Sequence, residues 1–180
     1  MSQWGLKDNF PGATMSKSAC LFMLLGLTAL AMSPAVAAED AGVLCDRLAG
    51  HPDDTTVAGK GVAFGKIDTG AAEAACTQAV SEHPDEARYL FQLGRVFDKK
   101  EDFPGAASYY ERAAAKGSAL AWNALGSLSE GGLGMPKDYA KAAQYYKRSA
   151  EAGLLAAYRS LAYLYYHGRL PGGPEEARKL

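Results

Sequence analysis

The stretch AASYYERAA at residues 106–114 returns as AAQYYKRSA at residues 142–150, 36 residues later. Gly117 returns as Gly153 at the same spacing. A Leu-Gly pair stands upstream of each copy, as Leu93-Gly94 and as Leu125-Gly126. A repeat of 20–50 residues is typical of solenoids, whose units stack because none can bury its apolar face alone. The pattern therefore predicts a repeat array that works by recognition and needs no catalytic pocket.

Composition agrees with a globular protein that binds other proteins. The 180 residues are 48% hydrophobic and 22% charged, which is too apolar for a disordered chain. The formal net charge is −1, and basic residues are interleaved with acidic ones. A nucleic-acid-binding domain usually carries a basic excess on one face. We therefore expect no nucleic-acid partner.

Residues 1–37 have the order of a secretory signal peptide. Lys17 supplies a short positive region, residues 19–32 form a run of 14 without a charge, and Ala35-Val36-Ala37 gives a small-x-small cleavage pattern. We expect cleavage after Ala37 or Ala38, and hence a periplasmic or secreted protein.

The alternative for this segment is a transmembrane anchor. The uncharged run is shorter than the roughly 20 residues that cross a bilayer, and Pro34 follows it. We therefore expect no stable membrane span after cleavage. Residues 1–14 precede a second methionine, Met15, and are interpreted as a mis-assigned start.

The cysteines predict one disulfide. Of the three, Cys20 leaves with the signal peptide, so that Cys45 and Cys76 remain. An even number in an oxidising compartment favours a Cys45–Cys76 bridge, and the alternative is two free buried thiols.

Helix signals divide the remaining chain into two parts. Residues 38–84 are predicted to form an N-terminal helical cap: a short helix over 38–48, a glycine-punctuated loop over 50–66, and a helix over 69–82 capped by Asp68. Residues 85–180 are predicted to form paired helices. Their expected ranges are 86–98, 104–116, 119–130, 137–152 and 155–167, with a further start at Pro174.

The repeats resemble a known family. Leu90-x2-Leu93-Gly94-x2-Phe97 and Trp122-x2-Leu125-Gly126-x2-Ser129 are similar to the first helix of a tetratricopeptide unit. The second copy adds the Gly-rich loop Glu130-Gly131-Gly132-Leu133-Gly134, then Asp138-Tyr139-Ala140-Lys141-Ala142 and Tyr145-Tyr146. This order resembles the Sel-1-like repeat, a relative of the tetratricopeptide repeat.

The resemblance implies an all-α, right-handed α-solenoid of antiparallel helix pairs that serves protein–protein recognition. We expect a non-catalytic scaffold with a protein or peptide partner. The third unit is incomplete at Leu180, which leaves two interpretations. Either this open edge docks another chain, which would be self-association, or the sequence is a fragment of a longer protein.

A second function is implied by some secreted, disulfide-linked members of the family, which are linked to β-lactam binding or hydrolysis. Those members carry a cysteine pair within each repeat, and residues 85–180 contain no cysteine. The alternative to a scaffold is a cell-envelope hydrolase or β-lactam-binding protein of this type, from which the cysteine-free repeats of this chain depart.

Motifs for other chemistry are missing from the sequence. No Gly-x-Ser-x-Gly or Ser-x-x-Lys occurs, and the three histidines have no zinc-ligand spacing. Residues 60–66 superficially resemble a phosphate-binding loop, but Lys60 stands where a Walker motif needs glycine and Ile67 follows Lys66. We expect no metal and no cofactor.

The resemblance also implies where a partner would bind. In such units the first helices line a concave groove, at positions two residues before the internal leucine, two after it, and five or six after it. The groove candidates on this rule are Phe91, Arg95, Asn123, Ser127, Arg159, Tyr163 and Tyr166. The same rule also places Asp98, Glu130 and His167 on this face. Arginine and tyrosine are enriched at binding hot spots, and two arginines could clamp a carboxylate or an extended peptide.

Overall fold

The computed structural model describes residues 39–57 and 59–180. All of the regular secondary structure in these ranges is helical, with no strand. The predicted signal peptide, residues 1–37, lies outside it. The α-helices are α1 (Ala41–Ala49), α2 (Thr69–Glu82), α3 (Ala87–Lys99), α4 (Phe103–Ala115), α5 (Ala119–Gly131), α6 (Tyr139–Glu151), α7 (Leu155–Tyr166) and α8 (Gly173–Ala177). A short 3-10 helix, η1 (Phe64–Lys66), precedes α2. None of the helices in the described ranges is long and apolar enough to cross a membrane.

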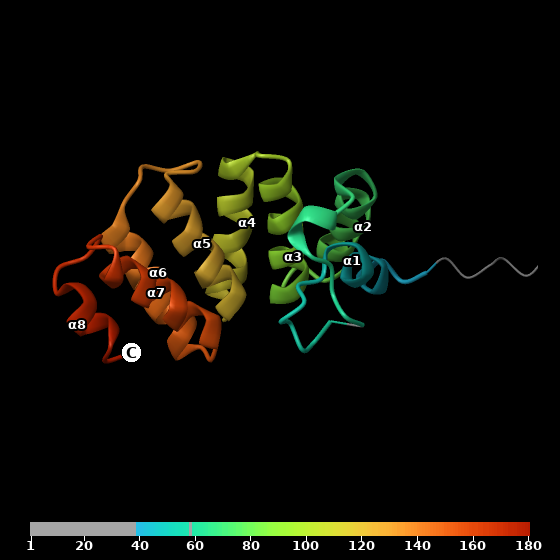
Figure 1. Ribbon diagram of the computed structural model, residues 1–180. Coiled ribbons are helices and arrows are strands. Elements are labelled where there is room, and N and C mark those ends of the chain that lie inside the picture. The colour runs from blue at the N-terminus through green and yellow to red at the C-terminus, as the bar shows by residue number, and fades with distance from the viewer. Residues whose placement is uncertain (1–38, 58) are drawn as a thin grey trace, which may run out of the picture. The chain divides into compact units, whose positions relative to one another are not determined.

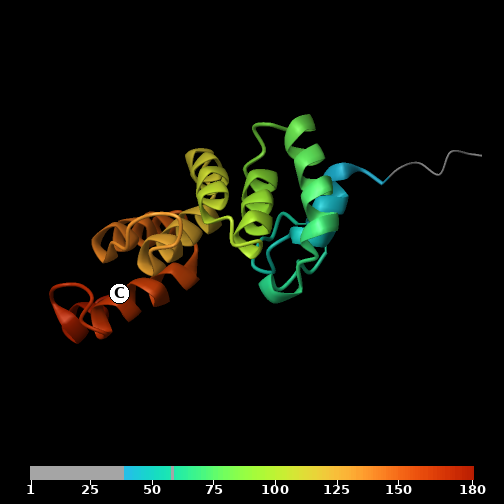
Figure 2. The ribbon, with the colours of Figure 1, turned by 90° about the horizontal axis from the view of Figure 1, so that it is seen from above.

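The helices pack in consecutive pairs, each joined by a loop. Within pairs, α1 packs on α2, α3 on α4, α5 on α6, and α7 on α8, while α2–α3, α4–α5 and α6–α7 contacts join each pair to the next. Figure 1 shows the pairs following one another in chain order, from the blue-green end to the red end. Seen from above, the green helices run up the view and the orange and red ones run across it (Figure 2). The predicted all-α solenoid of helix pairs is confirmed.

Polar caps set where several helices begin. The Asp68 carboxylate accepts hydrogen bonds from the N–H groups of Gly70 and Ala71, as the sequence predicts. Asp138 accepts from the Lys141 N–H at 2.9 Å. Because Asp138 is the cap, α6 begins at Tyr139, two residues later than the predicted start at 137.

In each complete repeat, a glycine on the first helix makes room for a tyrosine ring on the second helix. A Cβ atom at Gly94 would lie 2.6 Å from the ring of Tyr110, and one at Gly126 would lie 2.5 Å from the ring of Tyr146. Both tyrosines are almost fully buried. The first helix thus needs glycine here, because any side chain would occupy the space of the ring.

The Gly-rich loop of the second repeat reaches back to the first. Gly132 ends α5 in the left-handed conformation, with φ of 71°. Gly134 also has positive φ, and a Cβ there would lie 2.7 Å from the carbonyl carbon of Phe103 and 2.8 Å from the nitrogen of Pro104. The loop therefore packs on the first turn of α4.

The predicted bridge between Cys45 and Cys76 is present and joins α1 to α2. Both cysteines are fully buried, in a cluster of small side chains that includes Ala49, Ala72 and Ala79. Alanines on both helices let their backbones approach closely. The bridge lies within the region that the sequence analysis assigns to the N-terminal cap.

Candidate functional site

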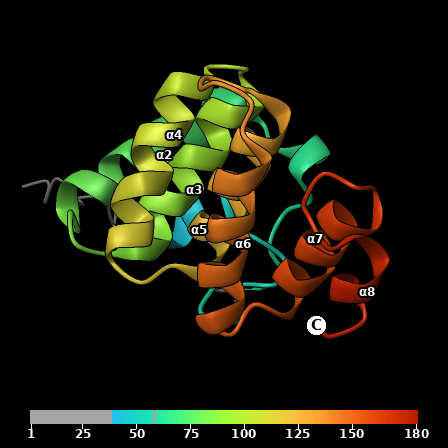
Figure 3. The same ribbon diagram turned by 90° about the vertical axis from the view of Figure 1, so that its left-hand side faces the viewer.

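A trough lies between the first helices of the second and third repeats. Two open depressions, of about 400 and 410 Å³, both border Glu130 of α5 and Tyr163 of α7. The first also borders Ser127, and the second borders Asn123 and Arg159. Five residues that the positional rule places in the groove, Glu130 among them, are thus brought together here. We call the two depressions together the trough (Figure 3 shows α5 and α7 from this end of the chain).

The wall of the trough on α5 is held by a buried tyrosine. The Tyr146 hydroxyl donates to Glu130 Oε2 at 2.7 Å and lies 3.3 Å from Ser127 Oγ. Burial raises the pKa of Tyr146, and the Glu130 carboxylate raises it further. The phenol therefore stays protonated, and its donated hydrogen bond orients the carboxylate at the rim of the trough.

The first repeat contains the same pairing of a buried tyrosine with a carboxylate. The Tyr110 hydroxyl donates to Asp98 Oδ2 at 3.1 Å. Burial raises the pKa of Asp98 and raises that of Tyr110 well above its ordinary value. Acid and tyrosine thus form a recurrent hydrogen bond between the two helices of a unit.

Basic side chains dominate the charge of the trough. Lys137 and Arg169 border the first depression and lie over the ring of Tyr139, at 5.6 and 5.2 Å from its centre. With Arg159 they set three cations against the single carboxylate of Glu130. The sequence analysis missed Lys137 and Arg169, because they lie in loops and the positional rule covered only first helices.

An asparagine in the trough carries an unused acceptor. Asn123 Oδ1 is buried and has no hydrogen-bond donor among the residues that the structure describes. A buried acceptor without a partner is costly, at about 1–3 kcal/mol.

Tyr166, another predicted groove residue, borders neither depression. Its side chain is 67% exposed, and its ring lies 5.4 Å from that of His167. The His167 ring in turn lies 4.2 Å from the ring of Tyr163. Tyr166 therefore connects to the trough only through an exposed aromatic cluster.

The prediction that Phe91 and Arg95 face an open groove is wrong. Both residues are 3% exposed. The Arg95 guanidinium donates to the carbonyl oxygens of Ala49 at 2.6 Å and Val62 at 2.8 Å. The N-terminal segment thus covers this part of α3, because its main-chain carbonyls give the buried guanidinium its partners.

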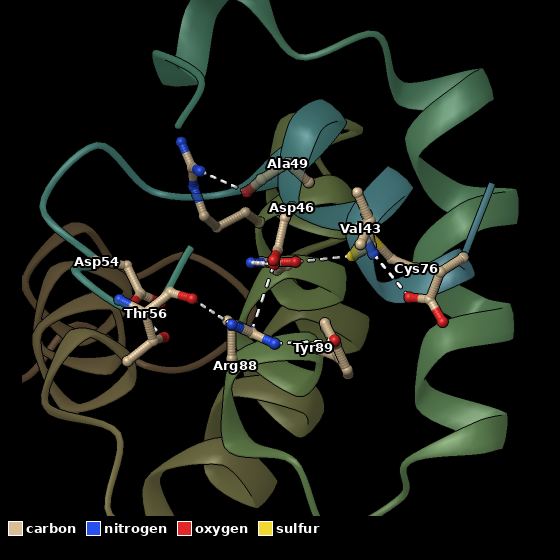
Figure 4. A network of polar contacts seen from close by, with 12 residues as sticks. Val43, Asp46, Ala49, Asp54, Thr56, Cys76, Arg88 and Tyr89 are labelled. Atoms are coloured by element: carbon tan, nitrogen blue, oxygen red, sulfur yellow. Dashed lines mark hydrogen bonds and ion pairs between the residues drawn. A yellow bond between two sulfur atoms is a disulfide. The ribbon is translucent and has the colours of Figure 1, made fainter. Parts of the chain in front are cut away.

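Further polar contacts hold the same segment on α3 (Figure 4). The buried carboxylate of Asp46 lies 3.4 Å from Arg88 Nε and accepts a hydrogen bond from Gln92 Nε2 at 2.8 Å. Arg88 also donates to the Thr56 carbonyl and, at 2.8 Å, to the Tyr89 hydroxyl. Arg88, Gln92 and Arg95 are spaced so that one face of α3 carries all three.

Comparison with known proteins agrees with this architecture. A Sel1 repeat model matches residues 119–154 and 155–180, and a tetratricopeptide repeat model matches residues 68–121. Residues 68–180 thus consist of repeats of the Sel1 and tetratricopeptide type. The two Sel1 matches coincide with the α5–α6 and α7–α8 pairs. The tetratricopeptide match begins at the cap residue of α2, within the segment that the sequence analysis assigns to the N-terminal cap.

Two solved structures of Sel1 proteins are similar to this chain. One is a Sel1 repeat protein from Oxalobacter formigenes, with a TM-score of 0.53 and 26% identity over 63% of this chain and 46% of the other. The second is c5321, a protective antigen present in uropathogenic Escherichia coli strains, with a TM-score of 0.50 and 30% identity over 59% of this chain and 23% of the other. The chain thus spans less than half the length of either structure. Comparison with curated proteins gave no match.

Proposed function

We propose that this Sel1 repeat protein is an exported scaffold that binds a protein partner through the trough between α5 and α7. Repeats of this kind generally mediate protein–protein contacts through surfaces formed by stacked helices. The observation that carries the proposal is the gathering of Asn123, Ser127, Arg159 and Tyr163 around Glu130. Rigid helices present these side chains in advance, which limits the entropy lost on binding.

The partner that fits the trough best is an extended acidic segment. Lys137, Arg159 and Arg169 offer charge complementarity to carboxylates, while the single acid of the trough already accepts from Tyr146. Asn123 adds an uncharged polar side chain to the lining of the second depression. Tyr163 is half exposed and adds contact area of the kind that hot spots use.

The trough can be tested by charge reversal. We expect Arg159→Glu combined with Tyr163→Ala to weaken capture of the partner from an envelope extract by at least tenfold. Arg112→Glu is the matched control, because Arg112 is exposed on α4 and borders neither depression of the trough. Equal capture by the trough variant and the control would contradict the proposed site.

Export is tested separately from binding. The Cys45–Cys76 bridge supports an oxidising compartment, where such bonds persist. We expect the protein in the periplasmic or extracellular fraction, with an N-terminus at Ala38 or Glu39. An intact N-terminus on cytoplasmic protein with reduced cysteines would contradict export without affecting the trough.

We also propose that residues 38–84 cap the array and that residues 85–180 carry the repeats. The cap would cover the apolar face of α3, as α1 and α2 do here. The β-lactam alternative has no support from the comparisons. The bridge also lies between α1 and α2, outside residues 85–180, whereas members of that type carry a cysteine pair within each repeat.

The C-terminal edge is a second candidate surface, for self-association. Tyr158, Leu161, Tyr165 and Leu180 border an open depression of about 250 Å³ there. Sedimentation of the chain across a concentration series measures whether this edge pairs. A single monomeric species at the highest concentration would contradict that role.

A further inference from the structure

A closed loop covers one face of α3, the first helix of the first repeat. The Val62 N–H donates to the Gly50 carbonyl at 2.7 Å, so that residues 51–61 leave and return at one point. Arg95 holds the base of the loop through the carbonyls of Ala49 and Val62. We call residues 51–61 the cover loop.

The cover loop touches α3 mainly through groups that another extended chain could supply. Its Thr56 carbonyl accepts from Arg88. The His51 ring lies 5.9 Å from the ring of Phe91. Among the loop residues that the structure describes, most of the others are exposed, and Val57 is the one that is well buried. The contact of the loop with α3 thus includes a main-chain carbonyl on an arginine and one ring on another.

The covered face corresponds in the repeat to the face that lines the trough. Phe91 occupies the same position in its unit as Asn123 and Arg159 do in the next two. An open depression of about 490 Å³ is bordered by residues 53–56 of the loop, by the start of α3, and by the turns that lead into α5 and α7. The cover loop thus occupies, in the first repeat, the position that the trough leaves open in the next two.

We propose that the face of α3 under the cover loop is a second peptide-binding surface, which the loop occupies in place of an extended acidic segment of a partner. The loop itself carries Asp53 and Asp54 against one lysine, Lys60. Arg88, Lys116 and Glu86 lie on the protein side of the depression that these acids border. Arg88 also pairs with Asp46, and Lys116 with Asp85, so that an acidic segment would share these two cations with the protein's own carboxylates. The ligand of this surface is therefore an extended peptide that presents a carbonyl to Arg88 and a ring to Phe91.

Competition between the loop and the partner sets the apparent affinity of this surface. A segment tethered by a short connection acts at an effective concentration of the order of millimolar. A free peptide then binds only to the fraction of molecules in which the loop has left, and its apparent Kd rises by the inverse of that fraction. Removal of the loop eliminates this competition.

The hydrogen bond at the loop base allows a clean removal. A β-turn places an N–H at position i+3 on the carbonyl at position i, which is how Val62 and Gly50 would meet across a two-residue turn. Residues 51–61 of the full chain are therefore replaced by Gly-Gly, which leaves α1, the disulfide and Arg95 in place. The probe is a fluorescent, end-blocked synthetic peptide of residues 49–62.

We expect the loop-replaced chain to bind the probe with a Kd at least tenfold lower than that of the wild type. A probe with Asp53 and Asp54 changed to lysine should bind at least tenfold more weakly, and this control leaves the protein untouched. Arg88→Gln in the loop-replaced chain should cause a similar loss. No gain on loop replacement, in a protein with wild-type helix content, overturns the proposal; equal binding of both probes overturns the acidic ligand.

Hydrogen exchange on the unaltered full chain tests release of the loop even if the replaced chain does not fold. We expect the Val62 N–H, which is hydrogen-bonded to the Gly50 carbonyl, to exchange at least a hundredfold faster than the central amides of α3. Exchange as slow as that of α3 would show that the loop opens only when the repeat unfolds, and would overturn the proposal.

Discussion

Gly126 lies where the packing leaves no room for a side chain. Its missing side chain leaves room for the Tyr146 ring, which would lie 2.5 Å from a Cβ. We expect Gly126→Ala to lower the free energy of unfolding by about 1–3 kcal/mol, because the ring must move within a packed core. Urea denaturation measures this difference.

Gly65→Ala is the matched control for this prediction. Gly65 lies in η1, and a Cβ there would meet no atom within 4 Å. Gly65→Ala therefore changes the backbone entropy as Gly126→Ala does, but without a steric clash. Similar unfolding free energies for the two variants would contradict the close packing of glycine against tyrosine.

His51 makes the cover loop sensitive to pH. Burial, and then the charge of Arg95, lower the pKa of His51 below its ordinary value of 6.5, while Asp53 and Asp54 act in the opposite direction. Between the folded and the unfolded pKa the unfolded chain binds more protons than the folded chain. The contribution of His51 to stability is therefore present above pH 6.5 and is lost as the pH falls through the folded pKa.

The measurement is the unfolding free energy of wild type and His51→Gln at pH values from 7.5 to 5. We expect the wild type to lose stability more steeply below pH 6.5 than the variant does. Protonation would also remove the acceptor that His51 Nδ1 offers to the Asp53 N–H, at 3.1 Å. His83→Gln, at an exposed position outside the loop, is the control, and parallel curves for wild type and His51→Gln would contradict the prediction.

At the scale of single helices, α6 depends on its cap. Asp138 accepts from the Lys141 N–H, and no acidic residue follows it in the first turn. We expect Asp138→Ala to cost about 1 kcal/mol of stability and Asp138→Asn to cost much less, since asparagine caps equally well. Thermal unfolding of both variants measures this, and equal losses would assign the effect to charge instead of capping.

Helix boundaries could be predicted because their signals are local. Asp68, Pro104 and the pair Gly117 and Gly153 act within a few residues, and α2 has the bounds that the sequence predicts. The errors have the same origin: α6 starts late because Asp138 serves as cap instead of as a helical residue. Local chemistry therefore accounts for the elements almost completely.

At the scale of the whole molecule, the disulfide closes a covalent loop that links α1 to α2. Cys45 and Cys76 are 31 residues apart, and the chain-entropy model gives such a bridge about 3–4 kcal/mol of stabilisation. We expect Cys45→Ser with Cys76→Ser to lower the unfolding free energy by this amount. Wild type under reducing conditions should match the double variant, and a loss below about 1 kcal/mol would contradict the model.

The candidate site was predictable only where the repeats are open. The periodic rule placed Asn123, Ser127, Arg159 and Tyr163 on one surface, and the structure brings them together. The rule failed for Phe91 and Arg95, because the segment that covers them is held by main-chain carbonyls, which every sequence has. No side-chain pattern in residues 49–62 signals that contact.

The packing of Gly134 against Phe103 and Pro104 decides how this protein could be taken apart. The sequence repeat suggests that residues 119–154 are a module that could be duplicated or moved. The loop of this module, however, packs on the first turn of α4, which belongs to the preceding repeat. An engineered array that places this module after a different neighbour would have to provide the same contact surface.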